Sequence, residues 1–211
     1  MADELAIFFP LPAGKAQYEG LKSAFVDFPR LLRTLRTDGH TGYVRLSNDD
    51  FSGVLLFHEG QLLHAVTTDG NGKMDDAAFG IFRRKMDAGE GNLDVIDLSS
   101  EIVVALGQLF TAQLMYTGLL GKFVNFAALL ELLSEERTSG AVIAVGAGDI
   151  GIILLRDGQI LGSYSQHDSR LVSDPAEVST IASEKTARIE VKSGSGATGG
   201  LDIEAALSRA Y

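Results

Sequence analysis

The four histidines are the residues of this sequence best suited to acid–base or metal chemistry: His40, His58, His64 and His167. His58 and Glu59 come just before a predicted turn, and His64 lies on the strand that returns from it. Two imidazoles facing each other across a hairpin, with a carboxylate beside them, could hold a metal ion. Ordinary strand histidines are commoner, so we predict neither a metal nor any other cofactor.

Two further patterns resemble binding loops. Residues 69–76 carry acid or amide side chains at alternating positions, but a calcium loop needs glycine where Met74 lies and glutamate where Gly80 lies. We interpret this segment as a polar loop before a helix whose first turn favours acids. Residues 146–151 fit G-x-G-x-x-G, but the apolar strand 152–155 follows where a dinucleotide site needs a helix, so we predict a hairpin turn.

Patterns typical of hydrolases do not hold up either. No serine lies in G-x-S-x-G. The carboxylate pairs Asp49-Asp50 and Asp75-Asp76 are adjacent in sequence, which suits a solvated acidic surface rather than a glycosidase pair. We predict that the protein is not an enzyme and has no catalytic residues.

Basic side chains recur on two predicted helices. The first helix carries Arg30, Arg33 and Arg36, and the second carries 83–85, which reads Arg-Arg-Lys. If the helices are neighbours, these residues form a basic patch on an acidic protein. We interpret the patch as a solvated face, with a partner-docking surface as the alternative. The residues that we assign to partner binding are Arg30, Arg33, Arg83, Arg84, His58 and His64.

Composition excludes several classes of protein. The 211 residues include 18 Lys and Arg against 28 Asp and Glu, a net charge of −10. Such a surface repels phosphate backbones and anionic lipid, so we expect neither a nucleic acid nor a membrane as partner. There is no cysteine, which excludes disulfides and thiolate chemistry. The apolar run 5–9 is too short for a signal peptide, and we expect a cytoplasmic protein.

An internal repeat dominates the sequence. FHEGQLLHA (57–65) recurs as LRDGQILGS (155–163), and Gly42 matches Gly140 at a constant spacing of 98 residues. The same spacing, without a gap, pairs Phe25-Val26 with Phe123-Val124 and Gly60-Gln61 with Gly158-Gln159. The second copy replaces His58 and His64 by Arg156 and Gly162, so any metal site would belong to one copy only. We infer two tandem copies of one unit.

Hydrophobic periodicity gives the elements of each unit. We predict a helix, three short antiparallel strands, a second helix and a closing strand. In the first copy these are 27–37, 42–47, 53–57, 62–67, 74–86 and 92–98. In the second copy the helices are 125–136 and 175–184, and the closing strand is 187–192. A helix from Glu101 to about Tyr116 joins the copies, a flexible link covers 193–200, and a short helix covers 201–211.

The fold class is therefore α+β, with two tandem homologous units joined by a central helix. Residues 1–99 form the first unit and 121–192 the second. Residues 100–120 form the connecting helix, and 193–211 form the link and the terminal helix.

Each unit resembles the PATAN domain, an α+β domain of bacterial signalling proteins. The pieces that carry the resemblance are FVDFPRLLRTL, TGYVRL, GVLLFHEGQ and LLHAV in the first copy, and FVNFAALLELL, SGAVIAV, GIILLRDGQ and ILGSY in the second. It extends through about Leu98 and Tyr164. The family tends to have histidine-alanine where the second copy has Gly162-Ser163, which counts against a site at His64 that both copies share. The resemblance implies an interaction or regulatory role beside response regulators and small GTPases, and it brings no active site.

We therefore expect a non-enzymatic protein-interaction or scaffold module of bacterial signalling, with a signalling protein or small GTPase as partner. The alternative is a regulatory protein that binds a small molecule between the two copies. The chain is expected to be a monomeric pseudo-dimer or a homodimer.

Overall fold

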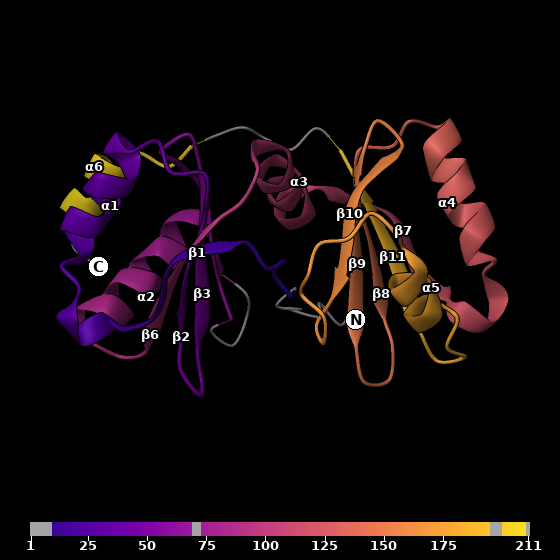
Figure 1. Ribbon diagram of the computed structural model, residues 1–211, viewed down its shortest axis with the longest axis horizontal. Helices are drawn as coiled ribbons and strands as arrows, with labels where there is room; N and C mark the ends of the chain where they lie inside the picture. Colours follow the sequence, from indigo (N-terminus) through magenta and orange to yellow (C-terminus); the bar gives the residue numbers. More distant parts are fainter. Residues whose placement is uncertain (1–9, 69–72, 195–199, 210–211) are drawn as a thin grey trace. The chain divides into compact units, whose positions relative to one another are not determined.

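The computed structural model describes residues 10–68, 73–194 and 200–209. The chain is α+β, as predicted, and it forms two compact units (Figure 1). Unit 1 comprises the described residues of Gly14–Val103 and Thr198–Tyr211. Unit 2 comprises those of Phe9–Ala13 and Val104–Ala197.

Unit 1 is a six-stranded antiparallel sheet with the order β1-β6-β2-β3-β4-β5. Its elements, in chain order, are β1 (Lys15–Lys22), the 3-10 turn η1 (Ser23–Phe25), α1 (Phe28–Thr37), β2 (Gly42–Ser47), β3 (Ser52–His58), β4 (Gln61–Thr67), β5 (Lys73–Met74), α2 (Asp75–Asp87) and β6 (Asn92–Asp97). The last described helix of the chain, α6 (Ile203–Ser208), also belongs to this unit.

Unit 2 repeats the sheet in five strands, with the order β7-β11-β8-β9-β10. The helix α3 (Ser100–Thr111) leads the chain from unit 1 into unit 2. The elements that follow are β7 (Gln113–Leu120), η2 (Gly121–Phe123), α4 (Phe126–Glu135), β8 (Gly140–Val145), β9 (Ile150–Arg156), β10 (Gln159–Ser165), α5 (Ala176–Ala182) and β11 (Arg188–Ser193). The strand order matches that of unit 1 once β5 is set aside, so the repeat in sequence is a repeat in topology.

The repeated glycines explain why both units adopt this path. Gly42 and Gly140 are the first residues of β2 and β8, with φ of 151° and 152°. Residues other than glycine rarely adopt this backbone conformation. Gly60 and Gly158 have φ of 76° and 78° in the hairpin turns after β3 and β9. Each sheet therefore turns where only glycine fits, and these positions persist in both copies.

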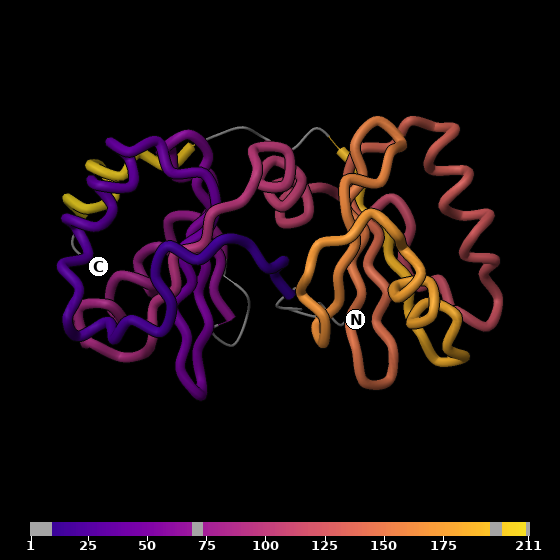
Figure 2. The backbone as a smooth tube through the Cα atoms, in the orientation of Figure 1, coloured from indigo at the N-terminus to yellow at the C-terminus, as the bar shows by residue number. Residues whose placement is uncertain are grey.

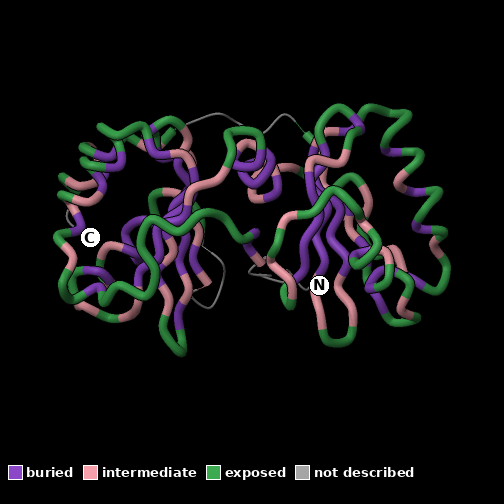
Figure 3. Tube along the Cα trace, in the orientation of Figure 1, coloured by how far each residue is buried: buried purple, intermediate pink, exposed green. Residues whose placement is uncertain are grey.

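One face of each sheet packs against helices. In unit 1, α1 and α2 place Phe28, Leu32 and Phe82 over apolar strand residues such as Leu55 and Phe57. In unit 2, α4 and α5 place Phe126, Leu133 and Val178 in the core. These side chains share one buried cluster with the strand residues Val142 and Ile153. Figure 3 shows the central strands of each sheet buried and the hairpin tips exposed. Nowhere in the described residues is a helix both long enough and apolar enough to cross a membrane.

The predicted helix between the copies is wrong beyond Thr111. Residues 113–120 form the strand β7, which pairs with β11 through contacts such as Leu119 with Ile189. The apolar pattern of this segment fits either element, and pairing with a strand distant in sequence decides the outcome. The equivalent strand of unit 1, β1, has no counterpart in the sequence prediction.

The end of the chain also differs from the prediction. The helix α6 is not a separate tail, because it packs against α1 and α2 of unit 1. Figure 2 shows this last segment running beside α1. Residue 193 of the predicted flexible link is the last residue of β11, and 195–199 lie outside the described residues. The same holds for 69–72 of the calcium-like loop and for the apolar run 5–9.

Candidate functional site

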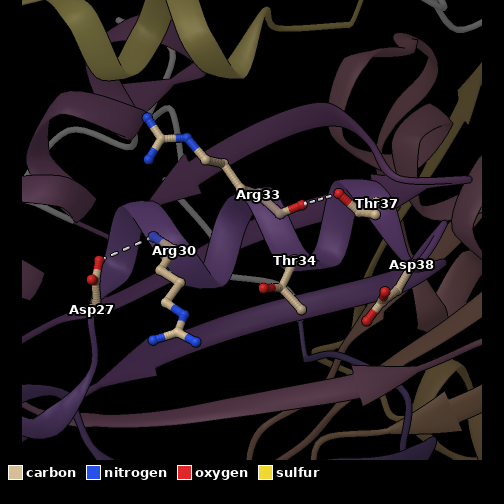
Figure 4. A pocket seen from close by; sticks show the side chains of 6 residues that line it. All are labelled: Asp27, Arg30, Arg33, Thr34, Thr37 and Asp38. Atoms are coloured by element: carbon tan, nitrogen blue, oxygen red, sulfur yellow. Dashed lines mark hydrogen bonds between the residues drawn. The ribbon is translucent and has the colours of Figure 1, made fainter.

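The outer face of α1 carries the first half of the predicted basic patch. Asp27 precedes the helix, and its carboxylate accepts a hydrogen bond of 3.0 Å from the Arg30 backbone N–H, which caps the first turn. Buried residues on the opposite side of the helix turn the arginines outward. An open hollow of about 450 Å³ lies on this face, lined by Asp27, Arg30, Arg33, Thr34, Thr37 and Asp38. In Figure 4 the guanidinium groups of Arg30 and Arg33 point to opposite sides of the helix.

Arg33 binds the C-terminal helix rather than standing free. Its Nε and Nη2 donate to the two carboxylate oxygens of Glu204 at 3.1 Å and 3.3 Å. These hydrogen bonds from Arg33 lower the pKa of Glu204 below its usual value. Because both side chains are about half exposed, the pair contributes little to stability, and its main effect is to fix the position of α6.

Arg83 has a similar role at the other end of α6. From α2, its Nη1 donates to the backbone carbonyls of Leu207 at 2.6 Å and Arg209 at 3.0 Å. Carbonyls at the end of a helix lack intrahelical partners, so a guanidinium there completes the helix. Two of the six residues predicted to bind a partner, Arg33 and Arg83, therefore already bind a segment of their own chain.

Arg30 and Arg84 remain on the surface of unit 1. Both side chains are exposed, one on α1 and one on α2. Because α1 contacts α2, the predicted neighbourhood of the two basic helices exists. The part of the patch open to a partner is smaller than predicted, because α6 lies against both helices.

His58 and His64 take different environments. Across the β3–β4 hairpin, His58 pairs with Gln61 and His64 with Leu56. His58 is half-buried, whereas His64 is buried with its Nδ1 3.2 Å from the Oδ1 of Asp75. Among the described residues, no three His, Cys, Asp or Glu side chains gather as metal ligands would.

A pair of exposed phenylalanines is a feature that the sequence reasoning did not single out. Phe25 ends η1 and is 83% exposed, and Phe123 ends η2 and is 78% exposed. Both turns are anchored by hydrogen bonds: the Ser23 N–H donates to Gly91 O at 3.1 Å, and the Gly121 N–H donates to Ala187 O at 2.9 Å. Each unit thus exposes a phenylalanine ring on a 3-10 turn that a backbone hydrogen bond anchors to the rest of the unit.

The sequence contained a signal for this pair, but an ambiguous one. Phe25 and Phe123 match in the repeat, and a match at an apolar position usually indicates core packing. The phenylalanines three residues later, Phe28 and Phe126, are the ones that enter the core. Because each 3-10 turn comes before the helix begins, helical periodicity cannot say which phenylalanine of each pair faces inward.

Comparison of the chain with family models, with curated proteins and with solved structures finds no match.

Proposed function

We propose that this protein is a non-enzymatic interaction or scaffold module that binds a protein partner through the aromatic rings of Phe25 and Phe123. The observation that carries the proposal is the exposure of a large aromatic side chain at the same position in both units. Aromatic side chains are enriched among the residues that dominate protein–protein binding. An exposed ring on an anchored turn also loses little conformational freedom when it is buried by a partner.

The surroundings of the two rings differ, although the rings themselves are retained. Lys122 Nζ lies 4.7 Å from the centre of the Phe123 ring, whereas Ala24 takes the equivalent place in unit 1. Both copies keep the phenylalanine although the residue before it differs. This favours a binding role for the two rings. The resemblance to the PATAN domain supports a partner from bacterial signalling, such as a response regulator or a small GTPase.

The test is co-purification of the tagged protein from its own cells under gentle conditions. We expect one signalling protein to be enriched with the unmodified chain and lost with the double variant Phe25→Ser/Phe123→Ser. Val172→Ser is the matched control, because Val172 is also an exposed apolar residue of this chain, 45% exposed. Hydrogen exchange of the purified variants verifies that both units remain folded. Retention of the partner by the double variant would contradict the proposal.

Arg84→Glu tests the basic surface separately. Arg84 is exposed, whereas Arg83 holds the end of α6, so a change at Arg84, unlike one at Arg83, alters the surface charge without disturbing α6. If Arg84 contributes to docking, its reversal weakens retention of the same partner at low salt more than at high salt.

A further inference from the structure

The helical face of unit 1 is closed by α6, which lies in a groove between α1, α2 and the start of β4. The Leu201 N–H donates to Leu62 O at 2.7 Å in an antiparallel bridge. Ile203 and Ala206 then join the core of the unit, with exposed fractions of 3% and 1%. The segment combines one strand-like contact with a short amphipathic helix.

Unit 2 has a corresponding face between α4, α5 and the start of β10, although α5 has 7 residues where α2 has 13. On the face that α4 and α5 cover, the described residues of unit 2 supply no third helix (Figure 1). Leu32 and Leu62 of unit 1 are fully buried, whereas their counterparts Leu130 and Ile160 are partly exposed. In the described part of the chain, no bridge like that of Leu201 reaches Ile160.

We propose that this face of unit 2, between α4, α5 and the start of β10, binds a short amphipathic helix from a partner protein, placed as α6 is placed in unit 1. The proposal goes beyond the proposed function, because it adds a second binding surface, separate from Phe25 and Phe123, and states the chemistry of the segment that binds there. The segment places apolar side chains where α6 has Ile203, Ala206 and Leu207, and an N–H where Leu201 has one.

Charge identifies the occupant further. Unit 1 grips Glu204 of α6 through Arg33, and the repeat places Glu131 where Arg33 lies. Glu131 is exposed on α4, with Glu135 one turn farther along the same helix. The partner helix therefore carries Lys or Arg at the position of Glu204. The α6 helix of a second copy would set Glu204 against Glu131, so a second copy is the disfavoured occupant.

The probes are two ten-residue peptides with the sequence of residues 200–209, one unmodified and one with Glu204→Lys. Peptides of this length are only marginally helical, so weak binding is expected. Amide chemical shifts of the full-length, isotope-labelled protein detect such binding and locate it. We expect the Glu204→Lys peptide to shift signals of α4 and the first half of β10, with an affinity several-fold higher than that of the unmodified peptide.

Variants of the protein test the two parts of the proposal. Ile160→Asp is expected to abolish the shifts, whereas the control Leu132→Asp, on an exposed side chain of α4, leaves them unchanged. Glu131→Lys is expected to reverse the order of the two peptides. The amide spectrum of each variant without peptide shows whether unit 2 remains folded.

Three outcomes would overturn the inference: no shifts in α4 or β10 at millimolar peptide, shifts confined to α1 and α2, or no preference between the peptides. The first two reject this face of unit 2 as a binding surface, and the third rejects the basic partner helix. None of them touches the proposed function, because co-purification that depends on Phe25 and Phe123 would still show an interaction module.

Discussion

Unit 1 and unit 2 share the order and pairing of five strands, yet they close their helical faces differently. Unit 1 receives α6 from the far end of the chain, while the described residues of unit 2 provide no counterpart. The residue that grips α6 in unit 1, Arg33, is replaced by Glu131. After duplication the backbone framework has stayed fixed, whereas the layer over the helices and its charge have diverged.

The backbone framework that both units share can be tested by the same substitution in each unit. A Cβ added at Gly42 would lie 1.9 Å from Ile96 O, and one added at Gly140 would lie 2.0 Å from Lys192 O. Because backbone on both sides must move, we expect Gly42→Ala and Gly140→Ala each to lower the free energy of unfolding of their own unit by about 3–5 kcal/mol. Since the chain has no tryptophan, hydrogen exchange with mass spectrometry is the measurement, because it resolves the two units.

Gly148→Ala is the control for these variants, since a Cβ there meets nothing within 4 Å. If either glycine variant were as stable as this control, the repeated glycines would not be what fixes the strand path.

A second change separates the units. Ile203→Ala leaves a cavity where α6 enters the core of unit 1, and we expect a loss of about 2–4 kcal/mol in that unit alone. Ile160→Ala, at the matching position on β10 of unit 2, removes a partly exposed side chain and should cost about 1 kcal/mol. Exchange protection of α1 and α2 reports the first loss, and that of α4 the second. If the two variants lowered the stability of their units equally, packing of α6 would not give unit 1 the additional stability that we expect.

Acid should also distinguish the units. Burial lowers the pKa of His40 below its ordinary value of 6.5, and the nearby Asp97 carboxylate, with its Oδ1 3.2 Å from Nδ1, only partly offsets this. The folded state therefore favours neutral His40, so its contribution is complete above pH 6.5 and is lost as the pH falls from there toward the lowered pKa. We expect unit 1 to lose stability between pH 7.5 and 5.5, while unit 2 does not share this loss.

Unit 2 has Thr138 in place of His40, so the variant His40→Thr serves as the control. It should remove the pH-dependent loss from unit 1. Persistence of that loss in the variant would assign it to another group.

The smallest effect is expected at the surface of α1. Arg33→Ala removes the donors that contribute most to lowering the pKa of Glu204, so that pKa should rise in a carboxylate titration followed by NMR. The stability of unit 1 should change less than with Gly42→Ala or Ile203→Ala, because the pair is solvated. An unchanged Glu204 titration would show that α6 does not occupy this position in solution.

Local patterns in the sequence predicted much of this fold. The spacing of Leu32 and Leu35 predicts α1, and the acid-glycine turn at Gly60 predicts the β3–β4 hairpin. The edge strands β1 and β7 were missed because their side chains are mostly exposed and their pairing with β6 and β11 is irregular, so neither alternates cleanly between apolar and polar residues.

The candidate site was less predictable. Whether Arg33 and Arg83 face solvent depends on α6, whose partners lie more than 100 positions away in sequence. A charge pattern shows where arginines gather on a helix, but not what reaches them from elsewhere in the chain.

The contact between Arg33 and Glu204 spans 171 positions of the chain. During synthesis, the strands of unit 1 leave the ribosome first, and the whole sheet of unit 2 follows before α6 emerges. At roughly 5–20 residues per second, this interval lasts on the order of ten seconds. The core of a nascent unit 1 therefore lacks α6 during this interval. A chaperone or a helix of another protein can bind between α1 and α2 until α6 is synthesised.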